Sequence, residues 1–258
     1  MNAHVIRQSF NRAASTYSAA AALQQLVAAQ LITMMRTNLP SSFSGNILDA
    51  GCGTGYCLQQ LHTLYPAATM FGVDFAESML RQLPASNQIG RLNADLQQLP
   101  LADGCMDLYV SSLAWQWCDV PTAIQEATRV LKPGSQLWVT TLVTGTFHEL
   151  SAAFADAGLA PAAHLLALPE QAAILDAFTG ADLSLITAQC QPVTTWHPDF
   201  VTLRHSIRGV GANRLPTAPR ESLNRTTRAG LLAAYETRRT PQGLPLTYQV
   251  LTLHAQCR

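Results

Sequence analysis

The sequence predicts an α/β fold built on a doubly wound, mostly parallel sheet. Strand-like apolar segments alternate with helical patterns through residue 142, which is the rhythm of parallel strands joined by crossover helices. A glycine-rich turn joins the first strand to the helix after it, as at the ligand-binding edge of such sheets. The chain has 258 residues, of which 48% are hydrophobic and 12% charged. We therefore expect one domain over residues 1–258 with a full core.

A helical segment of about residues 1–40 precedes the predicted sheet. Within it, apolar residues such as Leu23, Val27 and Leu31 recur at three- and four-residue steps and predict an amphipathic helix over 18–35. Ser18 is the expected N-cap of that helix, because a serine hydroxyl can accept from a free backbone N–H of the first turn.

Five strands and three helices follow, with a loop in place of a helix between the third and fourth strands. The expected strands cover residues 46–50, 69–73, 89–94, 106–112 and 135–142. The expected helices cover 54–64 and 76–83, and a third begins after Asp119 as N-cap and runs through Leu131. Lys132-Pro133-Gly134 ends the third helix and turns the chain into the fifth strand.

After residue 142 the alternation breaks. Strands at 183–190 and 244–254 are predicted as an antiparallel pair that completes a seven-stranded sheet. About fifty residues separate them, where a hairpin needs only about 2–5. We expect insertions at about 143–182 and 191–243 that form a helical cap over the ligand-binding edge of the sheet. The expected cap helices cover 146–157, 169–178, 198–209 and 221–238.

The formal charge is zero overall but unevenly distributed. Residues 1–190 carry seven basic and thirteen acidic side chains, whereas residues 191–243 carry eight arginines and three acids. Lys132 is the only lysine, so the positive charge of the cap is guanidinium, which pairs well with carboxylate and phosphate. The pattern favours an acidic partner or substrate; the alternative is a scattered set of solvated arginines.

The composition also bears on the compartment. No apolar run reaches the roughly 18 residues of a membrane span, and the N-terminus does not have the pattern of a signal peptide. The six cysteines include no C-x-x-C pair, and the histidines show no metal-ligand spacing. We expect reduced thiols, no bound metal and a cytoplasmic protein.

The segment Ile47 to Gly55 reads Ile-Leu-Asp-Ala-Gly-Cys-Gly-Thr-Gly. Its glycine spacing is G-x-G-x-G, which differs from the G-x-G-x-x-G of a dinucleotide site, and no Gly-Lys-Ser/Thr of a P-loop is present. The segment resembles motif I of the class I S-adenosylmethionine-dependent methyltransferases. That resemblance implies a Rossmann-like methyltransferase domain whose glycine turn packs against the ribose and amino-acid end of the cofactor.

Two acids extend the resemblance. Asp74 ends the second strand nineteen residues after Gly55, and Asp95-Leu96 follow the third. A carboxylate at the first position can accept both hydroxyls of a ribose diol, and the resemblance implies that Asp95 accepts from the adenine amino group. Phe75 and Met79 would pack on the adenine. The alternatives are a helix N-cap for Asp74, a surface loop for Asp95 and core positions for the apolar pair.

The residues leaving the fourth strand complete the expected site. Leu113 and Gln116 are candidates to touch cofactor or acceptor, whereas Trp115 and Trp117 are expected to be structural because large aromatics usually serve burial. The complete cofactor-binding set is Tyr17, Asp49, Gly51, Cys52, Gly53, Gly55, Asp74, Phe75, Met79, Asp95, Leu96 and Leu113.

A closer resemblance covers nearly the whole chain. Several segments are similar to the malonyl-acyl carrier protein O-methyltransferases of biotin synthesis: Ser9 to Tyr17 followed by Leu23-Gln24, Ser112 to Ala114 with Gln116 to Cys118, Phe147 to Leu150, Ile207 to Arg214, Ala234 to Glu236 and Thr240 to Tyr248. The resemblance implies transfer of a methyl group from S-adenosylmethionine to the free carboxylate of a malonyl thioester. The ester would then prime synthesis of the pimeloyl precursor of biotin.

The expected substrate fits the residue chemistry. A malonyl carboxylate is already ionised at neutral pH, since carboxyl pKa values lie near 4, so no general base is required. Tyr17 is the candidate for positioning the acceptor, although it could instead anchor the N-terminal helix. The expected substrate-binding residues are Gln116, Arg204, Arg208, Asn213 and Arg214; Arg204 and Arg208 share a helix face.

Three other functions are open from the sequence. Another methyltransferase of this fold would act on carbon, nitrogen or phenol and would normally need a base in its acceptor pocket. A non-catalytic cofactor-binding scaffold would use the arginines to dock a protein. Nucleic-acid binding is disfavoured by the neutral net charge and the scarcity of lysine.

Overall fold

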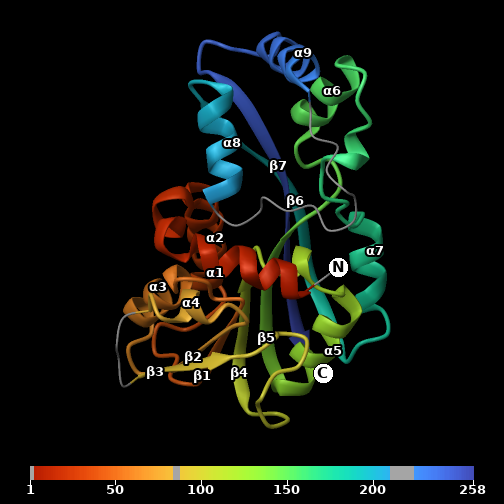
Figure 1. The fold of residues 1–258 in the computed structure, drawn as a ribbon. Coiled ribbons are helices and arrows are strands. Elements are labelled where there is room, and N and C mark those ends of the chain that lie inside the picture. Colours follow the sequence, from red (N-terminus) through yellow and green to blue (C-terminus); the bar gives the residue numbers. More distant parts are fainter. Residues whose placement is uncertain (1–2, 84–87, 210–223) are drawn as a thin grey trace.

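The computed structural model describes residues 3–83, 88–209 and 224–258, except for the side chains of residues 3, 18–20, 208 and 209. Its centre is a seven-stranded sheet with the order β3-β2-β1-β4-β5-β7-β6 (Figure 1). The strands are β1 Asn46–Ala50, β2 Thr69–Asp74, β3 Ile89–Asn93, β4 Met106–Ser112, β5 Leu131–Leu142, β6 Leu183–His197 and β7 Leu244–Cys257. The α-helices are α1 Ala3–Ala20, α2 Ala22–Arg36, α3 Tyr56–Leu64, α4 Glu77–Leu80, α5 Val120–Val130, α6 His148–Asp156, α7 Gln171–Phe178, α8 Phe200–Gly209 and α9 Arg225–Glu236.

The strand directions confirm the predicted fold class. Strands β1 to β5 pair in parallel, and β7 is antiparallel to both β5 and β6. Two buried clusters cover the two faces of the sheet, one around Tyr109, Trp115 and Leu251 and the other around Met35 and Trp138. Because parallel strands run the same way, the carboxyl ends of β1, β2 and β4 meet at one edge, where ligands bind in such sheets.

The N-terminal segment forms two helices, so the predicted single helix over 18–35 is wrong at its start. Ser18 lies inside α1, and α2 begins after Ala21, which is 2% exposed. The Ala-rich stretch favours helix throughout and contains no signal for a break, so packing decides where the chain bends. Among the described residues no single helix could span a membrane, although His4–Tyr17 and Ala22–Arg36, bent by 88°, meet the length and composition criteria as a pair.

Several element ends differ from the sequence prediction. Strand β6 continues to His197, past Pro192, because a proline is tolerated on an edge strand where its missing N–H faces no partner. Strand β5 begins at Leu131, and the Lys132–Gly134 turn falls in the register shift opposite Met106 and Leu108. The predicted N-cap is confirmed, since the Asp119 carboxylate accepts from Thr122 N at 3.1 Å.

The cap grows out of the last two strands. Pairing between β5 and β7 stops at Leu142 and Val250, but pairing between β6 and β7 continues to His197 and Leu244. This two-stranded ribbon projects beyond the sheet and carries α6, α8 and α9 (Figure 1). Helices α8 and α9 lie between β6 and β7 in the chain, as expected for a helical insertion between the last two strands, although it begins only after His197. In the other predicted insertion, α7 packs against α5 in the buried cluster on one face of the sheet and is not part of the cap.

A third buried cluster, which includes Leu203, Tyr235 and Leu246, holds the cap together. Glu149 of α6 joins the cap to the ribbon, because its buried carboxylate accepts from the backbone N–H of Thr247 at 3.1 Å and from the Thr247 hydroxyl. A buried donor that loses such an acceptor costs about 1–3 kcal/mol.

We therefore predict that Glu149→Ala lowers the free energy of unfolding by about 2–4 kcal/mol, measured by chemical denaturation. The matched control is Glu170→Ala, the same change at an exposed position whose side chain makes no helix-cap bond; it should change the free energy of unfolding by less than about 0.5 kcal/mol. Equal effects of the two substitutions would show that the Glu149–Thr247 bonds do not secure the cap.

Candidate functional site

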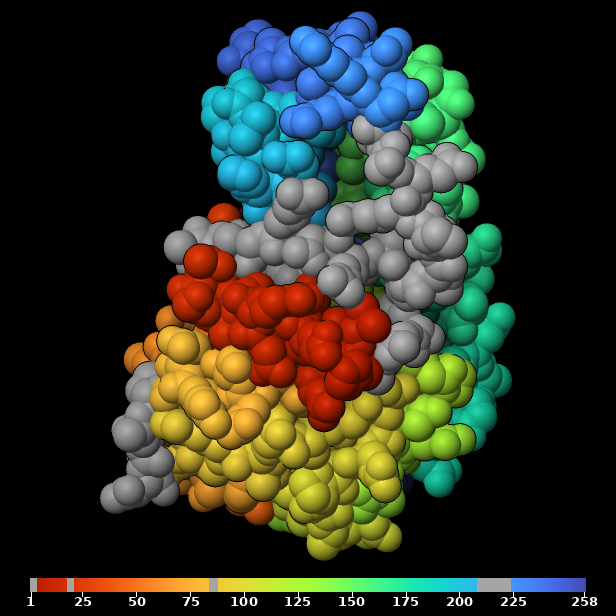
Figure 2. Space-filling model, viewed as in Figure 1, coloured from red at the N-terminus to blue at the C-terminus, as the bar shows by residue number. Residues whose placement is uncertain are grey.

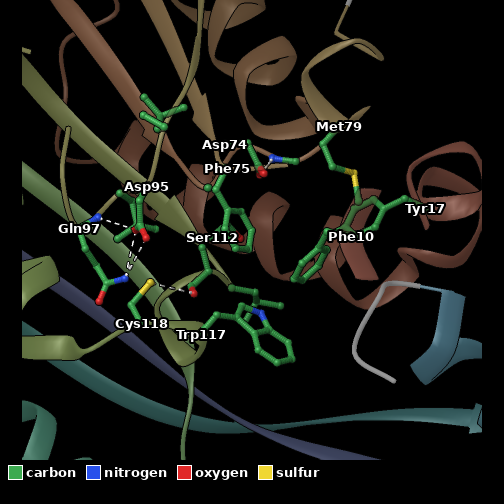
Figure 3. A pocket seen from close by; sticks show the side chains of 17 residues that line it. Phe10, Tyr17, Asp74, Phe75, Met79, Asp95, Gln97, Ser112, Trp117 and Cys118 are labelled. Carbon is green, nitrogen blue, oxygen red and sulfur yellow. Dashed lines mark hydrogen bonds between the residues drawn. The ribbon is translucent and has the colours of Figure 1, made fainter. Parts of the chain in front are cut away.

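Two adjoining cavities lie along the carboxyl edge of the parallel strands. The first is enclosed by α1, the glycine turn and the segments that follow β2, β3 and β4 (Figure 3). The second lies between the glycine turn and α2. Tyr17, Gly51, Gly53 and Ser112 line both, so a single elongated ligand can extend from one cavity into the other.

The three glycines of the turn are required for different reasons. A Cβ on Gly53 would lie 3.8 Å from the Tyr17 ring, so this position faces the cavity. Gly51 (φ +79°) and Gly55 (φ +83°) are left-handed and tightly packed, because a Cβ would lie 2.3 Å from Ala114 Cβ and 1.9 Å from Leu83 Cδ2 respectively. Gly51 lines both cavities, whereas Gly55 is outside the described lining of either.

Asp74 connects the glycine turn to the segment after β2. Its Oδ2 accepts from Gly53 N at 2.9 Å and its Oδ1 from Ala76 N at 2.8 Å. Burial raises the pKa of this carboxyl to about 6, against the lowering effect of those two bonds. Each carboxylate oxygen can accept a second bond, so capacity for a diol remains.

The N-cap alternative for Asp74 does not describe this geometry. Helix α4 begins at Glu77. The first-turn N–H of Ser78, which has no acceptor within the helix, donates to Asn11 Oδ1 of α1 at 2.9 Å. Ala13 and Ala14 of α1 pack with Ala76 and Met79 in a separate small cluster. Helix α1 is thereby docked across the front of the first cavity, and Figure 2 shows this red segment between the sheet layer and the cap.

The far end of the first cavity contains Asp95. Its carboxylate accepts from Gln97 N at 2.9 Å and from Gln97 Nε2 at 3.1 Å, and Gln97 Oε1 accepts from Asp119 N. The loop after β3 is thus held in one conformation. Leu96 and Leu113 also line this cavity, as do the predicted Phe75 and Met79.

Sequence reasoning missed part of this lining. Phe10 contacts Phe75 and Trp117, with ring centroids 6.0 and 5.6 Å apart (Figure 3). Trp115 is structural as expected, since it is fully buried against Phe178, but Trp117 lines the cavity. Phe10 lies seven residues before Tyr17 on the same helix face, which is the one signal that could have placed it. Gln97, Ser112 and Cys118 also line the cavity without having been predicted.

Leu113 is one of two non-glycine residues with positive φ in the described chain, at 53°. Its carbonyl accepts from Gln116 Nε2 at 2.6 Å, and Gln116 Oε1 accepts from Thr141 Oγ1 at 3.3 Å. The amide of Gln116 is therefore engaged in holding a strained turn. Gln116 lines neither cavity, so its predicted contact with substrate stays a prediction.

The second cavity contains the other buried acid. Asp49 is 1% exposed, and its Oδ2 has no hydrogen-bond partner among the described residues. Burial, followed by the nearby Asp74, raises its pKa to about 7. Burial also raises the pKa of the Cys52 thiol and the Tyr17 hydroxyl, so both stay protonated at neutral pH.

The cap arginines fall into three groups. Arg238 pairs with Asp156 at 2.6 Å and Arg239 with Glu236 at 2.7 Å. Arg225 and Arg228 are exposed and have no ion pair with a described acid. Arg204 has a buried Nε without a described partner but lines neither cavity. The Arg208 side chain, Asn213 and Arg214 lie outside the described part of the chain.

Comparisons with known proteins identify this chain as a protein with a methyltransferase domain. Residues 48–139 match the family model described as "Methyltransferase domain". A putative methyltransferase from Bacillus halodurans C-125 aligns with a TM-score of 0.61 at 13% identity, over 89% of this chain and 97% of that one. Geranyl diphosphate C-methyltransferase from Streptomyces coelicolor A3(2), solved with S-adenosyl-L-homocysteine, aligns with a TM-score of 0.55 at 15% identity, over 89% and 76%. These structures share the class I methyltransferase fold.

Curated relatives then define the family. The malonyl-[acyl-carrier protein] O-methyltransferase of Dechloromonas aromatica is 41% identical over 97% of this chain and 93% of its own length. That of Herminiimonas arsenicoxydans is 37% identical over 98% and 95%. This chain belongs to the malonyl-[acyl-carrier protein] O-methyltransferase family. A biotin biosynthesis bifunctional protein of Cellvibrio japonicus is 32% identical over 96% of this chain and 49% of its own length.

The raised pKa of Asp49 leads to a pH-dependent prediction for the ligand-free protein. The folded pKa of about 7 exceeds the ordinary 3.8, so the ionised carboxylate destabilises the fold increasingly as pH rises from about 4 to about 7. Asp49→Asn should therefore be more stable than the native chain at pH 8, by a margin about 2–3 kcal/mol larger than at pH 5.

Denaturant unfolding at the two pH values measures that margin. The matched control is Asp176→Asn, which removes an equal charge from an exposed position of α7 and should give the same small difference at both pH values. A margin for Asp49→Asn that does not change with pH would contradict the assignment of a buried, uncompensated carboxylate.

Proposed function

We propose that this chain transfers the methyl group of S-adenosylmethionine to the free carboxylate of malonyl-acyl carrier protein, giving a methyl ester used in biotin synthesis. The observation that carries this proposal is the pair of adjoining cavities at one sheet edge, with Asp74 and Asp95 in the first and, in the second, Asp49 with one carboxylate oxygen that has no partner among the described residues. Family membership supports the choice of acceptor. The six free cysteines suit a reducing compartment, and we assign the enzyme to the cytoplasm.

The first cavity suits the adenosine part of the cofactor. Asp74 would accept from the ribose hydroxyls through its remaining lone pairs, and Asp95 from the adenine amino group. The rings of Phe10, Phe75 and Trp117 supply an apolar enclosure, which is the usual lining of such a site. Bound there, the cofactor supplies an electrophilic methyl group on its sulfonium.

The protein's contribution to the reaction is orientation and exclusion of water. The boundary between the cavities is formed by Tyr17, Ser112 and the glycine turn. Tyr17 stays protonated and can donate a hydrogen bond to one oxygen of the acceptor carboxylate while the other attacks. Holding two reactants in line contributes up to about 7–11 kcal/mol to a barrier in favourable cases, and no proton has to be removed.

The cap supplies the proposed docking surface for the acidic carrier protein. Arg225 and Arg228 open α9, are exposed and have no described acidic partner, whereas Arg238 and Arg239 are engaged within the cap. Because neither arginine of the first pair is bound to an acid that the structure describes, this pair is the proposed contact for the carrier's acidic groups, and Arg204 is the described candidate to reach the malonyl carboxylate. Such rim charges mainly raise the rate of encounter.

A turnover assay tests the reaction. The full chain is incubated with malonyl-acyl carrier protein and methyl-labelled S-adenosylmethionine, and the expected product is a base-labile methyl ester with stoichiometric S-adenosylhomocysteine. Transfer to a phenol, amine or carbon acceptor without ester formation would favour a different methyltransferase. Cofactor binding with no transfer to any acceptor would favour a scaffold.

The docking surface gives a second prediction. Arg225→Ala with Arg228→Ala should raise the KM for the carrier-bound substrate about 3- to 30-fold and reduce its salt dependence, with kcat little changed. Arg36→Ala, which removes an exposed arginine at the end of α2, is the control. An unchanged KM would move the docking surface away from α9.

A further inference from the structure

Two residues that line the second cavity each have a buried acceptor atom without a partner among the described residues. One is Asp49 Oδ2 at the end of β1, and the other is the side-chain carbonyl oxygen of Gln24 in α2. Neither has a hydrogen-bond donor among the described residues. A buried acceptor without a donor costs about 1–3 kcal/mol, and more when it is charged. Their presence in one cavity points to a ligand that brings donors.

The lining of the second cavity also indicates which donor group of a ligand would fit there. The side chains around the second cavity include no lysine, arginine or histidine among the described residues, so the charge of Asp49 has no counter-ion there. A primary ammonium carries a positive charge and three N–H donors. It can donate to a carboxylate and to an amide carbonyl.

Gln24 lies on the face of α2 that lines the second cavity. Ala21, Gln24 and Ala28 all line the second cavity, and their spacing places them on one face of the helix. Ala21 and Ala28 are too short to provide an acceptor. Gln25 shares this face and also lines the cavity, but the Gln24 carbonyl is the one recorded as buried without a partner among the described residues. Gln24 can therefore meet a ligand while α2 stays packed on α3 and β5.

We propose that Gln24 is a cofactor-binding residue whose side-chain carbonyl, together with Asp49, accepts hydrogen bonds from the α-ammonium of the cofactor. The inference rests on the proposed function, which places the adenosine in the first cavity. The amino-acid end then extends past Gly51 and Gly53, which line both cavities, into the second. The N-terminal helices would thus recognise both ends of the cofactor, adenine through Phe10 and the amino group through Gln24.

Calorimetric titration of the full chain with three ligands tests the assignment. S-adenosylhomocysteine carries the ammonium and the carboxylate, its decarboxylated analogue carries only the ammonium, and 5′-methylthioadenosine carries neither. Gln24→Met keeps the length of the side chain but removes the amide. We expect it to weaken binding of the first two ligands about 10- to 100-fold, as for a hydrogen bond to a charged group, and binding of methylthioadenosine less than twofold.

The control variant is Gln30→Met, an identical change on the exposed face of α2, which should leave all three affinities unchanged. Equal weakening of all three ligands by Gln24→Met would overturn the proposal, because it would mean that α2 had moved. A loss confined to the ligand with a carboxylate would overturn it too, since the amide would then donate to that carboxylate. If the native chain binds none of the three, it is the proposed function that fails.

Discussion

The site depends on one buried carboxylate. Asp74 accepts from the backbone of Gly53 on one side and of Ala76 on the other, so the turn after β1 and the segment after β2 are held as a single unit. Because β1 and β2 are parallel and in register from Asn46 opposite Thr69 to Ala50 opposite Val73, both segments leave the sheet at the same level. Helix α1 then docks on that unit through Asn11 and Ser78, and the first cavity is the space enclosed between them.

The electrostatics of the two cavities follow from this packing. Asp49 and Asp74 are both buried, burial raises the pKa of each, and the nearby Asp74 raises the pKa of Asp49 further. A ligand with positive charge at its sulfonium and ammonium relieves a cost that the ligand-free protein bears. Raised carboxyl pKa values in a cavity are typical of functional sites.

The cap is held on the β6–β7 ribbon by apolar packing and by the hydrogen bonds of Glu149, not by the carboxylate that organises the cavities. The ribbon of β6 and β7 extends beyond the sheet, and its outer part is held by the apolar cluster around Tyr235 and by the bonds between Glu149 and Thr247. Two of its arginines are used for ion pairs within the cap, and two at the start of α9 face solvent. Composition alone indicated a basic segment. The pairing with Asp156 and Glu236 distinguishes Arg238 and Arg239 from Arg225 and Arg228, which have no ion pair with an acid in the described part of the chain.

Local pattern was sufficient to determine the alternation of strands and helices, the glycine turn and the two acids at strand ends, because each depends on residues close together in sequence. The N-cap at Asp119 is of the same kind, whereas the antiparallel pairing of the last strand joins β7 to the distant strands β5 and β6. Only the tertiary structure decided the break at Ala21, the extension of β6 past Pro192, and the positions of Phe10, Gln24 and Trp117 against the cavities. These features depend on contacts between distant segments, for which an alanine-rich stretch or a lone aromatic carries no local signal.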